Sequence, residues 1–285
     1  MLTGYSYGMF NLSEYLSNQR AAVEAALDDA MPAESTPPAL LHKAMRYSVL
    51  SGGKRLRPIL AIAAAEAIDS DAKAVIRPAI AVELLHTYTL IHDDLPCMDD
   101  DDQRRGQPTS HKQFGEANAI LAGDALQALA FEMAAQSTIA PEKVVQELAL
   151  AAGSLGVVGG QVADIAAGDV LSEDEIRFIH QHKTADLFRA AIRMGAIAAG
   201  ASEDDLNALT VYGSNTGMAF QIIDDILDAD ESDDDSCSCI GLYGIAGAKQ
   251  KAEELTANAV EALNSLGGRT EPLKAIAEHM LERTY

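Results

Sequence analysis

The longest stretch without proline runs from residue 142 to residue 271, and it limits the possible folds more than any other feature of this sequence. Proline breaks a helix because its ring clashes with the preceding turn and its nitrogen carries no hydrogen. The chain is rich in alanine and has few short alternating runs of valine and isoleucine, so helix is favoured over strand. We therefore expect a series of long helices.

Two apolar segments support this expectation. Residues 117–136 are nearly all apolar without alternation, which predicts a helix buried on most sides. Residues 187–201 repeat the pattern, with alanine and glycine that would let neighbouring backbones approach closely. The predicted connectors are short: 32–38, 51–53, 96–108, 167–173 and 267–272. We therefore predict an all-α chain, a single domain over residues 1–285 built from roughly ten or more helices.

Charge and composition exclude several classes of protein. Lys plus Arg number 21 against 43 Asp plus Glu, a formal net charge of -22, so the surface repels the phosphate backbone of nucleic acids. Hydrophobic residues make up 48% of the chain, enough for a sizeable core. Uninterrupted apolar runs are shorter than the roughly 18 residues of a membrane span, so we expect a protein that does not span a membrane.

The cysteines and the N-terminal segment bear on the compartment. Three cysteines, Cys97, Cys237 and Cys239, are too few for a disulfide framework and favour a reducing compartment. Residues 1–20 lack a basic head followed by an apolar run, so they do not resemble a secretory signal. We therefore expect a cytoplasmic protein.

Acidic residues gather in two clusters, each directly after an apolar stretch: residues 93–102 and residues 224–235. Carboxylates that end a buried apolar helix need a compensating cation. Asp224 and Asp228 are four residues apart and share a helix face with Gln221. Ligation by oxygen alone selects a hard cation such as Mg²⁺. For residues 230–235 we expect a solvated acidic face.

Basic residues are scarce, so their positions are informative. Gly52 and Gly53 precede three cations at residues 54–57, beside a predicted helix start. Free backbone N–H groups there, together with Lys54 and Arg57, could hold a phosphate group.

Further cations follow along the chain. Arg104 and Arg105 come directly after the first acidic cluster, where they either neutralise it or bind a substrate. Lys183, with Thr184, lies between two apolar stretches. Two carboxylate clusters and several separate cations suggest an enzyme that binds two polyanionic substrates, at least one of them through bridging metal.

Five segments then occur in a characteristic order: GGKRLRP (52–58), DDLPCMDDDDQRRG (93–106), GGQVAD (159–164), HKT (182–184) and FQIIDDILD (220–228). They resemble the short-chain trans-isoprenyl diphosphate synthases, most closely the bacterial-type farnesyl diphosphate synthases, over nearly the whole chain. The resemblance implies the isoprenoid synthase fold, a polyprenyl synthetase domain with its helices around a central active-site cavity. It also implies condensation of isopentenyl diphosphate with an allylic diphosphate, dimethylallyl or geranyl.

The resemblance also implies the roles of individual residues. Several Mg²⁺ ions would bridge the allylic diphosphate to carboxylates on two walls, namely Asp93, Asp94, Asp99, Asp224, Asp225 and Asp228. Isopentenyl diphosphate, which needs no metal of its own, would be held by Lys54, Arg57, His86 and Arg105. The allylic substrate would be surrounded by Arg104, Lys183, Thr184 and Gln221.

Product length is expected to depend on Tyr88 or Thr89, five and four residues before Asp93 and little more than one helical turn below the metal site. In the resembled family, an aromatic residue at the fifth position, with the two-residue insertion seen here at residues 96–97, accompanies a farnesyl (C15) product. A smaller residue there often accompanies a geranylgeranyl (C20) product. We therefore expect mainly farnesyl diphosphate, the alternatives being a C20 product or a Tyr88 that is an ordinary packed aromatic.

One departure from the family follows Asp228. The family has a lysine-bearing loop there, whereas this sequence has an acidic run and a Cys237-x-Cys239 pair before residues 240–248 resume the pattern. About a dozen residues and every lysine of that loop are absent, either through deletion or because the sequence omits a loop. A metal or redox site at the two cysteines is not expected, because no histidine lies near them.

Two other classes of protein share part of this pattern. A class I terpene cyclase would replace the second aspartate motif by an Asn/Ser/Glu triad and lack the isopentenyl-binding cations. A regulatory partner subunit with weak activity would usually lack an aspartate motif, and here both are present. Because the resembled family is dimeric and helices as apolar as 117–136 need a covering partner, we expect a homodimer with C₂ symmetry.

Overall fold

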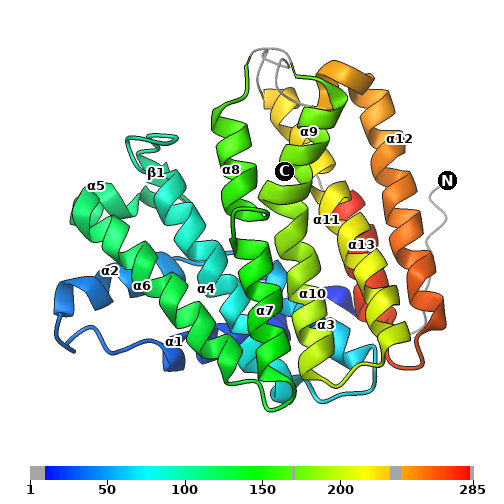
Figure 1. Cartoon of the computed structure of the whole chain (residues 1–285), viewed down its shortest axis with the longest axis horizontal. Coiled ribbons are helices and arrows are strands. Elements are labelled where there is room, and N and C mark those ends of the chain that lie inside the picture. The colour runs from blue at the N-terminus through cyan, green and yellow to red at the C-terminus, as the bar shows by residue number, and fades with distance from the viewer. Residues whose placement is uncertain (1–9, 169–170, 232–238, 283–285) are drawn as a thin grey trace.

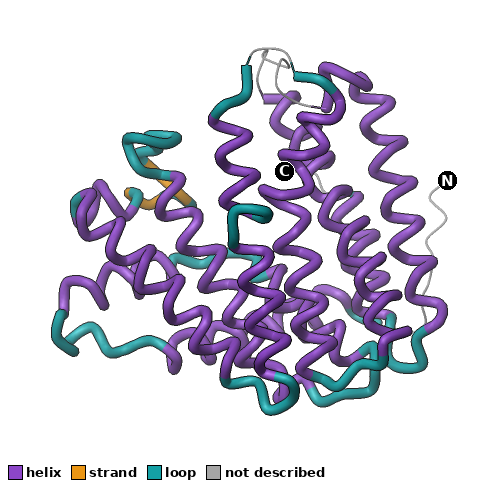
Figure 2. Tube along the Cα trace, in the orientation of Figure 1, coloured by secondary structure: helices purple, strands orange, loops and turns teal. Residues whose placement is uncertain are grey.

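The computed structural model describes residues 10–168, 171–231 and 239–282, and this part of the chain is almost entirely helical (Figure 2). The α-helices are α1 (Leu12–Ala30), α2 (Ala39–Leu50), α3 (Leu56–Glu66), α4 (Ile76–Asp93), α5 (Ser110–Phe114), α6 (Glu116–Ala135), α7 (Pro141–Ala152), α8 (Val157–Ile165), α9 (Glu173–Ile179), α10 (Asp186–Ala198), α11 (Glu203–Glu231), α12 (Cys239–Ala262) and α13 (Glu271–Leu281). The prediction of an all-α fold with ten or more helices is confirmed.

Shorter elements join these helices. Two 3₁₀ helices, η1 (Ala72–Val75) and η3 (Leu263–Ser265), and one π-helix, η2 (His180–Ala185), are described. Strands β1 (Gln103–Arg104) and β2 (Gln107–Pro108) form a small antiparallel hairpin inside the predicted connector 96–108.

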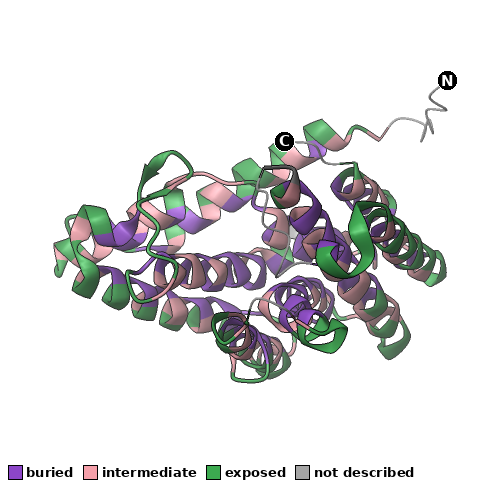
Figure 3. Ribbon diagram, turned by 90° about the horizontal axis from the view of Figure 1, so that it is seen from above, coloured by how far each residue is buried: buried purple, intermediate pink, exposed green. Residues whose placement is uncertain are grey.

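The helices form a bundle in which α4 and α10 lie inside and α6, α8, α9 and α12 lie around them (Figure 1). Buried residues gather on the inward sides of the helices and exposed residues on the outer sides (Figure 3). α1 packs against α13, so the first and last described helices belong to one bundle.

Small residues bring α3 and α10 together, as the composition of residues 187–201 predicted. A Cβ atom at Gly195 would lie 2.0 Å from the carbonyl oxygen of Ala61, so only glycine allows this approach. α3 and α10 are therefore closely packed, and Phe188, near the start of α10, is fully buried.

One detail of the prediction was wrong. The segment 117–136 forms α6 as expected, but it is not buried on most sides, because Ile120 and Leu121 are 43% and 54% exposed. α6 packs on α4 and also contacts α2, α5 and α7, whereas Ile120 and Leu121 stay exposed.

Two helical stretches are long and apolar enough, by length and composition alone, to cross a membrane: Lys73–Asp93 and Pro141–Ile165. The first is 67% buried in its most apolar window and contains the core helix α4. The second is 33% buried and is divided where α7 ends at Ala152 and α8 begins at Val157. Neither feature by itself indicates a membrane span.

Candidate active site

The first aspartate cluster begins where α4 ends. Asp93 is the last residue of α4, and the following loop returns so that the Asp99 N–H donates to the Asp93 carbonyl at 2.9 Å. Burial, with Asp99 and Asp94 nearby, raises the pKa of the Asp93 carboxyl to about 6, although Lys183 and Arg104 act in the opposite direction. The cations around Asp93 do not fully compensate its charge, as expected for a carboxylate that awaits a further cation.

Asp94 is held by a protein partner. Its side chain is buried, and the Arg104 Nε donates to Asp94 Oδ1 at 2.7 Å. Arg104 belongs to β1 and also contacts Asp101 at 3.4 Å. Two of the predicted site residues therefore bind one another.

The second aspartate cluster lies near the end of α11, and its middle member, Asp225, is also engaged. Asp225 Oδ2 lies 3.1 Å from His180 Nε2 and accepts from the Cys239 backbone N–H at 3.0 Å. Gln221 Nε2 donates to Oδ1 at 3.0 Å. Burial alone would raise the pKa of Asp225, but these bonds outweigh it and lower the pKa. Asp225 thus joins α11, η2 and the start of α12.

The other two aspartates of α11 are placed differently. Asp224 is half-buried, and its charge acts on Arg57 at the start of α3. Asp228 is exposed at the end of the helix. Cys237 and the side chains of residues 230–235 lie outside the described residues, so the expected acidic face is not tested.

The π-helix η2 carries the predicted Lys183 and Thr184. Lys183 Nζ pairs with Asp164 Oδ2 at 2.5 Å, and Thr184 Oγ1 donates to Gln221 Oε1 at 2.6 Å. A Cβ atom at Gly160 of α8 would lie 2.2 Å from the backbone nitrogen of Lys183, so this glycine lets η2 approach α8 closely. π-helical turns frequently occur at functional sites, and this one connects α8, α10 and α11.

A cavity of about 410 Å³ lies at the start of α3. Its lining residues are Ser51, Gly53, Lys54, Arg55, Leu56, Arg57, Glu83, His86, Arg105, Phe188 and Phe220. All four residues that the resemblance assigned to isopentenyl diphosphate therefore line one cavity.

Glycine is required where Arg105 meets the loop before α3. Gly52 and Gly53 have φ values of +90° and +133°, and the Arg105 guanidinium donates to the Gly52 carbonyl. A Cβ atom at Gly53 would lie 2.9 Å from that guanidinium. The glycine pair thus brings the hairpin arginine to the cations of α3.

The electrostatics of the cavity suit an anion. Burial lowers the pKa of Arg57 to about 10, with Arg105 acting in the same direction. Burial and the surrounding arginines also hold the pKa of His86 well below its usual value, so His86 is neutral at pH 7. The Arg57 guanidinium lies 4.7 Å from the centre of the Phe188 ring, and its Nε is buried without a hydrogen-bond partner among the described residues. This is a pocket of crowded, partly dehydrated cations.

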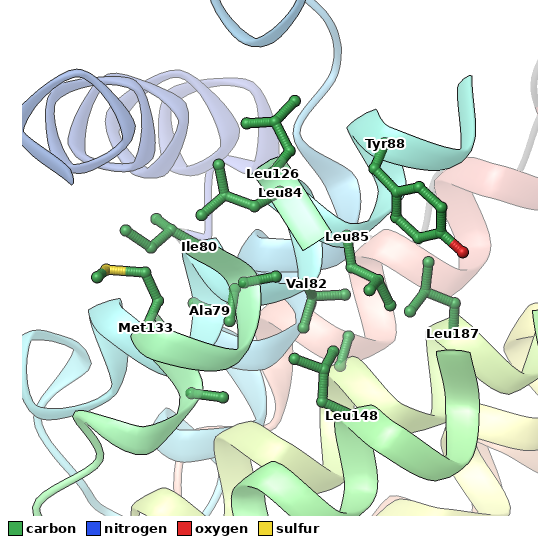
Figure 4. Close-up of a cluster of buried hydrophobic side chains, with 14 of the residues drawn as sticks. Ala79, Ile80, Val82, Leu84, Leu85, Tyr88, Leu126, Met133, Leu148 and Leu187 are labelled. Carbon is green, nitrogen blue, oxygen red and sulfur yellow. The ribbon is translucent and has the colours of Figure 1, made fainter. Parts of the chain in front are cut away.

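The side chains of Tyr88 and Thr89 have different surroundings. Tyr88 is 6% exposed and packs among apolar side chains that include Leu85 and Leu187 (Figure 4). Thr89 is half-buried, and its hydroxyl donates to the His86 carbonyl at 2.8 Å. By helical geometry Thr89 lies almost directly below Asp93, and Tyr88 lies on the flank beside it.

A separate group of side chains, which was not predicted, could also hold a metal ion. Ligand atoms of Asp100, Asp102 and His111 lie within 4.8 Å of one another. Lys112 already pairs with Asp102 at 2.6 Å, so one of these charges is neutralised by the protein.

Sequence reasoning missed three partners of the site. Asp164 was noted only within a motif, yet it pairs with Lys183. His180 gave no signal, because only the π-helical turn brings it to Asp225. Glu83 did give a signal, since a carboxylate in the apolar run before His86 must be buried and paired.

The contacts place the predicted residues in one region. Asp93 interacts with Lys183, Thr184 binds Gln221 of α11, and Asp224 interacts with Arg57 in the cation-lined cavity. Carboxylates able to hold metal ions therefore lie next to cations able to hold phosphate. This arrangement suits the class of α-helical proteins that bind phosphorylated small molecules.

Comparison with known proteins identifies the family within that class. Residues 38–237 match the polyprenyl synthetase family. The chain is 41% identical to "Geranylgeranyl pyrophosphate synthase 7, chloroplastic" of Arabidopsis thaliana, over 98% of this chain and 86% of that protein. It is 40% identical to the "Heterodimeric geranylgeranyl pyrophosphate synthase large subunit 1, chloroplastic" of the same plant, over 96% and 80% of the two chains.

Solved structures agree. An FPP/GFPP synthase from Zymomonas mobilis superposes with a TM-score of 0.88 at 37% identity, covering 95% of this chain and 99% of that one. The chain therefore belongs to the polyprenyl synthetase family, a family of prenyltransferases, and has the isoprenoid synthase fold.

Proposed function

We propose that this protein condenses isopentenyl diphosphate with dimethylallyl or geranyl diphosphate and yields mainly farnesyl diphosphate. The observation that carries the proposal is the cation-lined cavity, in which Lys54, Arg57, His86 and Arg105 meet beside the carboxylate clusters. Arginines that lie close together are suited to a diphosphate, which presents several anionic oxygens to planar donors.

In the proposed reaction the C–O bond of the allylic diphosphate breaks, and the double bond of isopentenyl diphosphate attacks the resulting allylic cation. A new C–C bond forms, and a proton then leaves the coupled product for the released diphosphate. Lys183 and Arg104 lie near Asp93, where they would stabilise the charge that develops on the leaving group. A nucleophilic side chain is not needed in this scheme.

The carboxylates fit a hard divalent metal. Asp93 has a raised pKa in a setting of other carboxylates, and all candidate donors are oxygens. Six aspartates would hold Mg²⁺: Asp93, Asp94, Asp99, Asp224, Asp225 and Asp228. In the metal-free protein Asp94 pairs with Arg104, and Asp225 lies beside His180. When bound, Mg²⁺ supplies Lewis-acid stabilisation of the departing diphosphate.

Tyr88 supports the C15 product. A buried phenol about one turn below Asp93 would limit the length of the growing chain. A geranylgeranyl product is the second candidate, because curated relatives at 40–41% identity are named geranylgeranyl synthases. The size of the side chain at Tyr88 is the feature that we propose decides between the two candidates.

We also propose that the protein acts as a homodimer. Exposed apolar residues follow one another on α8 and just before it, at Leu155, Val158, Val162 and Ile165, with exposed fractions of 42–80%. Ile120 and Leu121 on α6 are a second exposed pair. A weakened partner subunit is the alternative, since one relative is named as a subunit of a heterodimeric synthase.

The proposed function is tested by product analysis. The purified protein is mixed with isopentenyl diphosphate, geranyl diphosphate and Mg²⁺, and the dephosphorylated products are separated by chromatography. We expect mainly farnesol, and no product when excess chelator is present. A mainly C20 alcohol would favour the second candidate, a cyclic hydrocarbon would indicate a cyclase, and absence of turnover would support the partner subunit.

A further inference from the structure

The cation-lined cavity contains one acidic side chain, Glu83, among its described lining residues. Glu83 lies on α4, three residues before His86, and is 3% exposed. A buried carboxylate in a pocket for anions requires an explanation, because it costs desolvation and repels a phosphate group.

Glu83 is bound to a cation of the same pocket. Glu83 Oε1 lies 2.8 Å from Nη1 of Arg55, which is 2% exposed. Arg55 Nη2 also donates to the Val49 carbonyl at 2.6 Å. Glu24 approaches Arg55 Nε at 3.8 Å, but its side chain is 43% exposed, so solvent screens that charge. Glu83 is therefore the buried counter-charge of Arg55.

The pair also fixes the loop that carries the substrate-binding cations. Arg55 adopts a left-handed backbone conformation, with φ of +52°, directly before the first residue of α3. Lys54 precedes it and Arg57 follows two residues later. The bond to Glu83 therefore ties this loop to α4, the helix that presents His86.

The influence of Glu83 extends beyond Arg55. Its charge stabilises the protonated forms of both Arg57 and Arg105, against the effect of their burial. Without Glu83, Lys54, Arg55, Arg57 and Arg105 would face one another in the cavity with no acidic lining residue among those described. The repulsion would be strongest at Arg55, which is 2% exposed and therefore little screened by water.

We propose that Glu83 is the resident counterion of the diphosphate pocket, which stabilises the empty protein and sets how tightly the pocket binds its anion. The inference rests on the proposed function, because it takes this cavity as the site of isopentenyl diphosphate. Glu83 does not need to touch the substrate: it acts through Arg55, Arg57 and Arg105 and is a positioning residue.

The test uses the full chain without metal, in excess chelator, with inorganic pyrophosphate as the probe and calorimetry as the measurement. We expect Glu83→Gln to bind pyrophosphate about tenfold more tightly than the wild type, because a buried repulsive charge is removed from the lining of the pocket. The same variant without ligand should melt at a lower temperature. The matched control, Glu24→Gln, removes the exposed charge near Arg55 and should bind within about twofold of the wild type.

Steady-state kinetics give a second readout that a merely structural role would not produce. In Glu83→Gln the KM for isopentenyl diphosphate should fall, while the KM for the allylic substrate stays within about twofold. Equal or weaker pyrophosphate binding by this variant would overturn the inference.

If Glu83→Gln does not fold, the double variant Arg55→Met, Glu83→Gln replaces the pair without leaving a lone buried charge. It should bind pyrophosphate no more weakly than the wild type, and a loss of more than about threefold would overturn the inference. Arg57→Gln tests the pocket itself: pyrophosphate binding that does not weaken in this variant would overturn its assignment to isopentenyl diphosphate. A wild type that turns over, together with unchanged binding in Glu83→Gln, would reject only the role of Glu83.

Discussion

Asp93 lies at the end of α4, and the burial of its carboxyl, which Lys183 and Arg104 do not fully offset, can be measured. Its pKa is raised from 3.8 to about 6, so the folded protein binds a proton between pH 4 and pH 6 more readily than the unfolded chain does. The stability that comes from the protonated carboxyl is therefore present below about pH 4 and is lost as the pH rises through 6.

We predict that Asp93→Asn raises the free energy of unfolding of the metal-free protein by about 1 kcal/mol at pH 7.5, with a smaller gain near pH 4. With Mg²⁺ and both substrates, the same variant should lose at least about 100-fold in kcat. Denaturant unfolding at the two pH values and steady-state assays measure these effects. Asp124→Asn, on the exposed side of α6, is the control and should change neither quantity. Near-normal turnover of Asp93→Asn would contradict the metal assignment.

Tyr88 gives a second prediction at this scale. Tyr88→Ala removes a buried ring about one turn below Asp93, so the products should shift from C15 toward C20 or longer. Each additional isoprene unit buries five carbons, worth a few kcal/mol at roughly 0.8 kcal/mol per carbon. Tyr88→Phe keeps the ring and should still give C15. Chromatography of the dephosphorylated products decides, and an unchanged C15 peak in Tyr88→Ala would place the floor of the cavity elsewhere.

The sequence predicted which functional residues lie together better than it predicted which of them bind one another. The motifs indicated that Lys54, Arg57, His86 and Arg105 act together, and one cavity contains all four. Neutralisation of the first cluster by Arg104 was one of two predicted alternatives, but its partner Asp94 was not predicted, because the pairing depends on how the hairpin folds back. A list of charged residues does not show which charges the protein already neutralises.

At the scale of elements, helix type and order followed from composition, but two features of the helices did not. η2 is π-helical, and this wider turn brings His180 to Asp225 without any signal in the apolar pattern. α12 begins at Cys239, whose N–H binds that same Asp225. The junction of η2, α11 and α12 therefore depends on tertiary contacts around one carboxylate.

The burial of α6 was predicted wrongly. Its composition predicted burial on most sides, yet α4, α2, α5 and α7 leave Ile120 and Leu121 exposed. Sequence reveals that a helix is apolar, but it does not reveal whether the covering surface belongs to the same chain. The exposed Ile120 and Leu121 are therefore a prediction about assembly.

For the whole molecule we predict a homodimer. Light scattering at micromolar concentration should return about twice the chain mass of 30.2 kDa. Leu121→Glu places a charge on the exposed face of α6 and should shift the protein toward the monomer, whereas Val211→Glu, at an exposed position of α11, should not. A wild type of about 30 kDa would contradict this prediction.

The central claim is that the cation-lined cavity and the two aspartate clusters form one active site, and a crystal structure with Mg²⁺, isopentenyl diphosphate and a non-ionisable allylic thiodiphosphate tests it most directly. We predict that the diphosphate of isopentenyl diphosphate lies within hydrogen-bond distance of Lys54, Arg57 and Arg105, and that Mg²⁺ is bound by Asp93 and Asp224. Isopentenyl diphosphate bound outside this cavity, or metal bound only at Asp100, Asp102 and His111, would contradict the account.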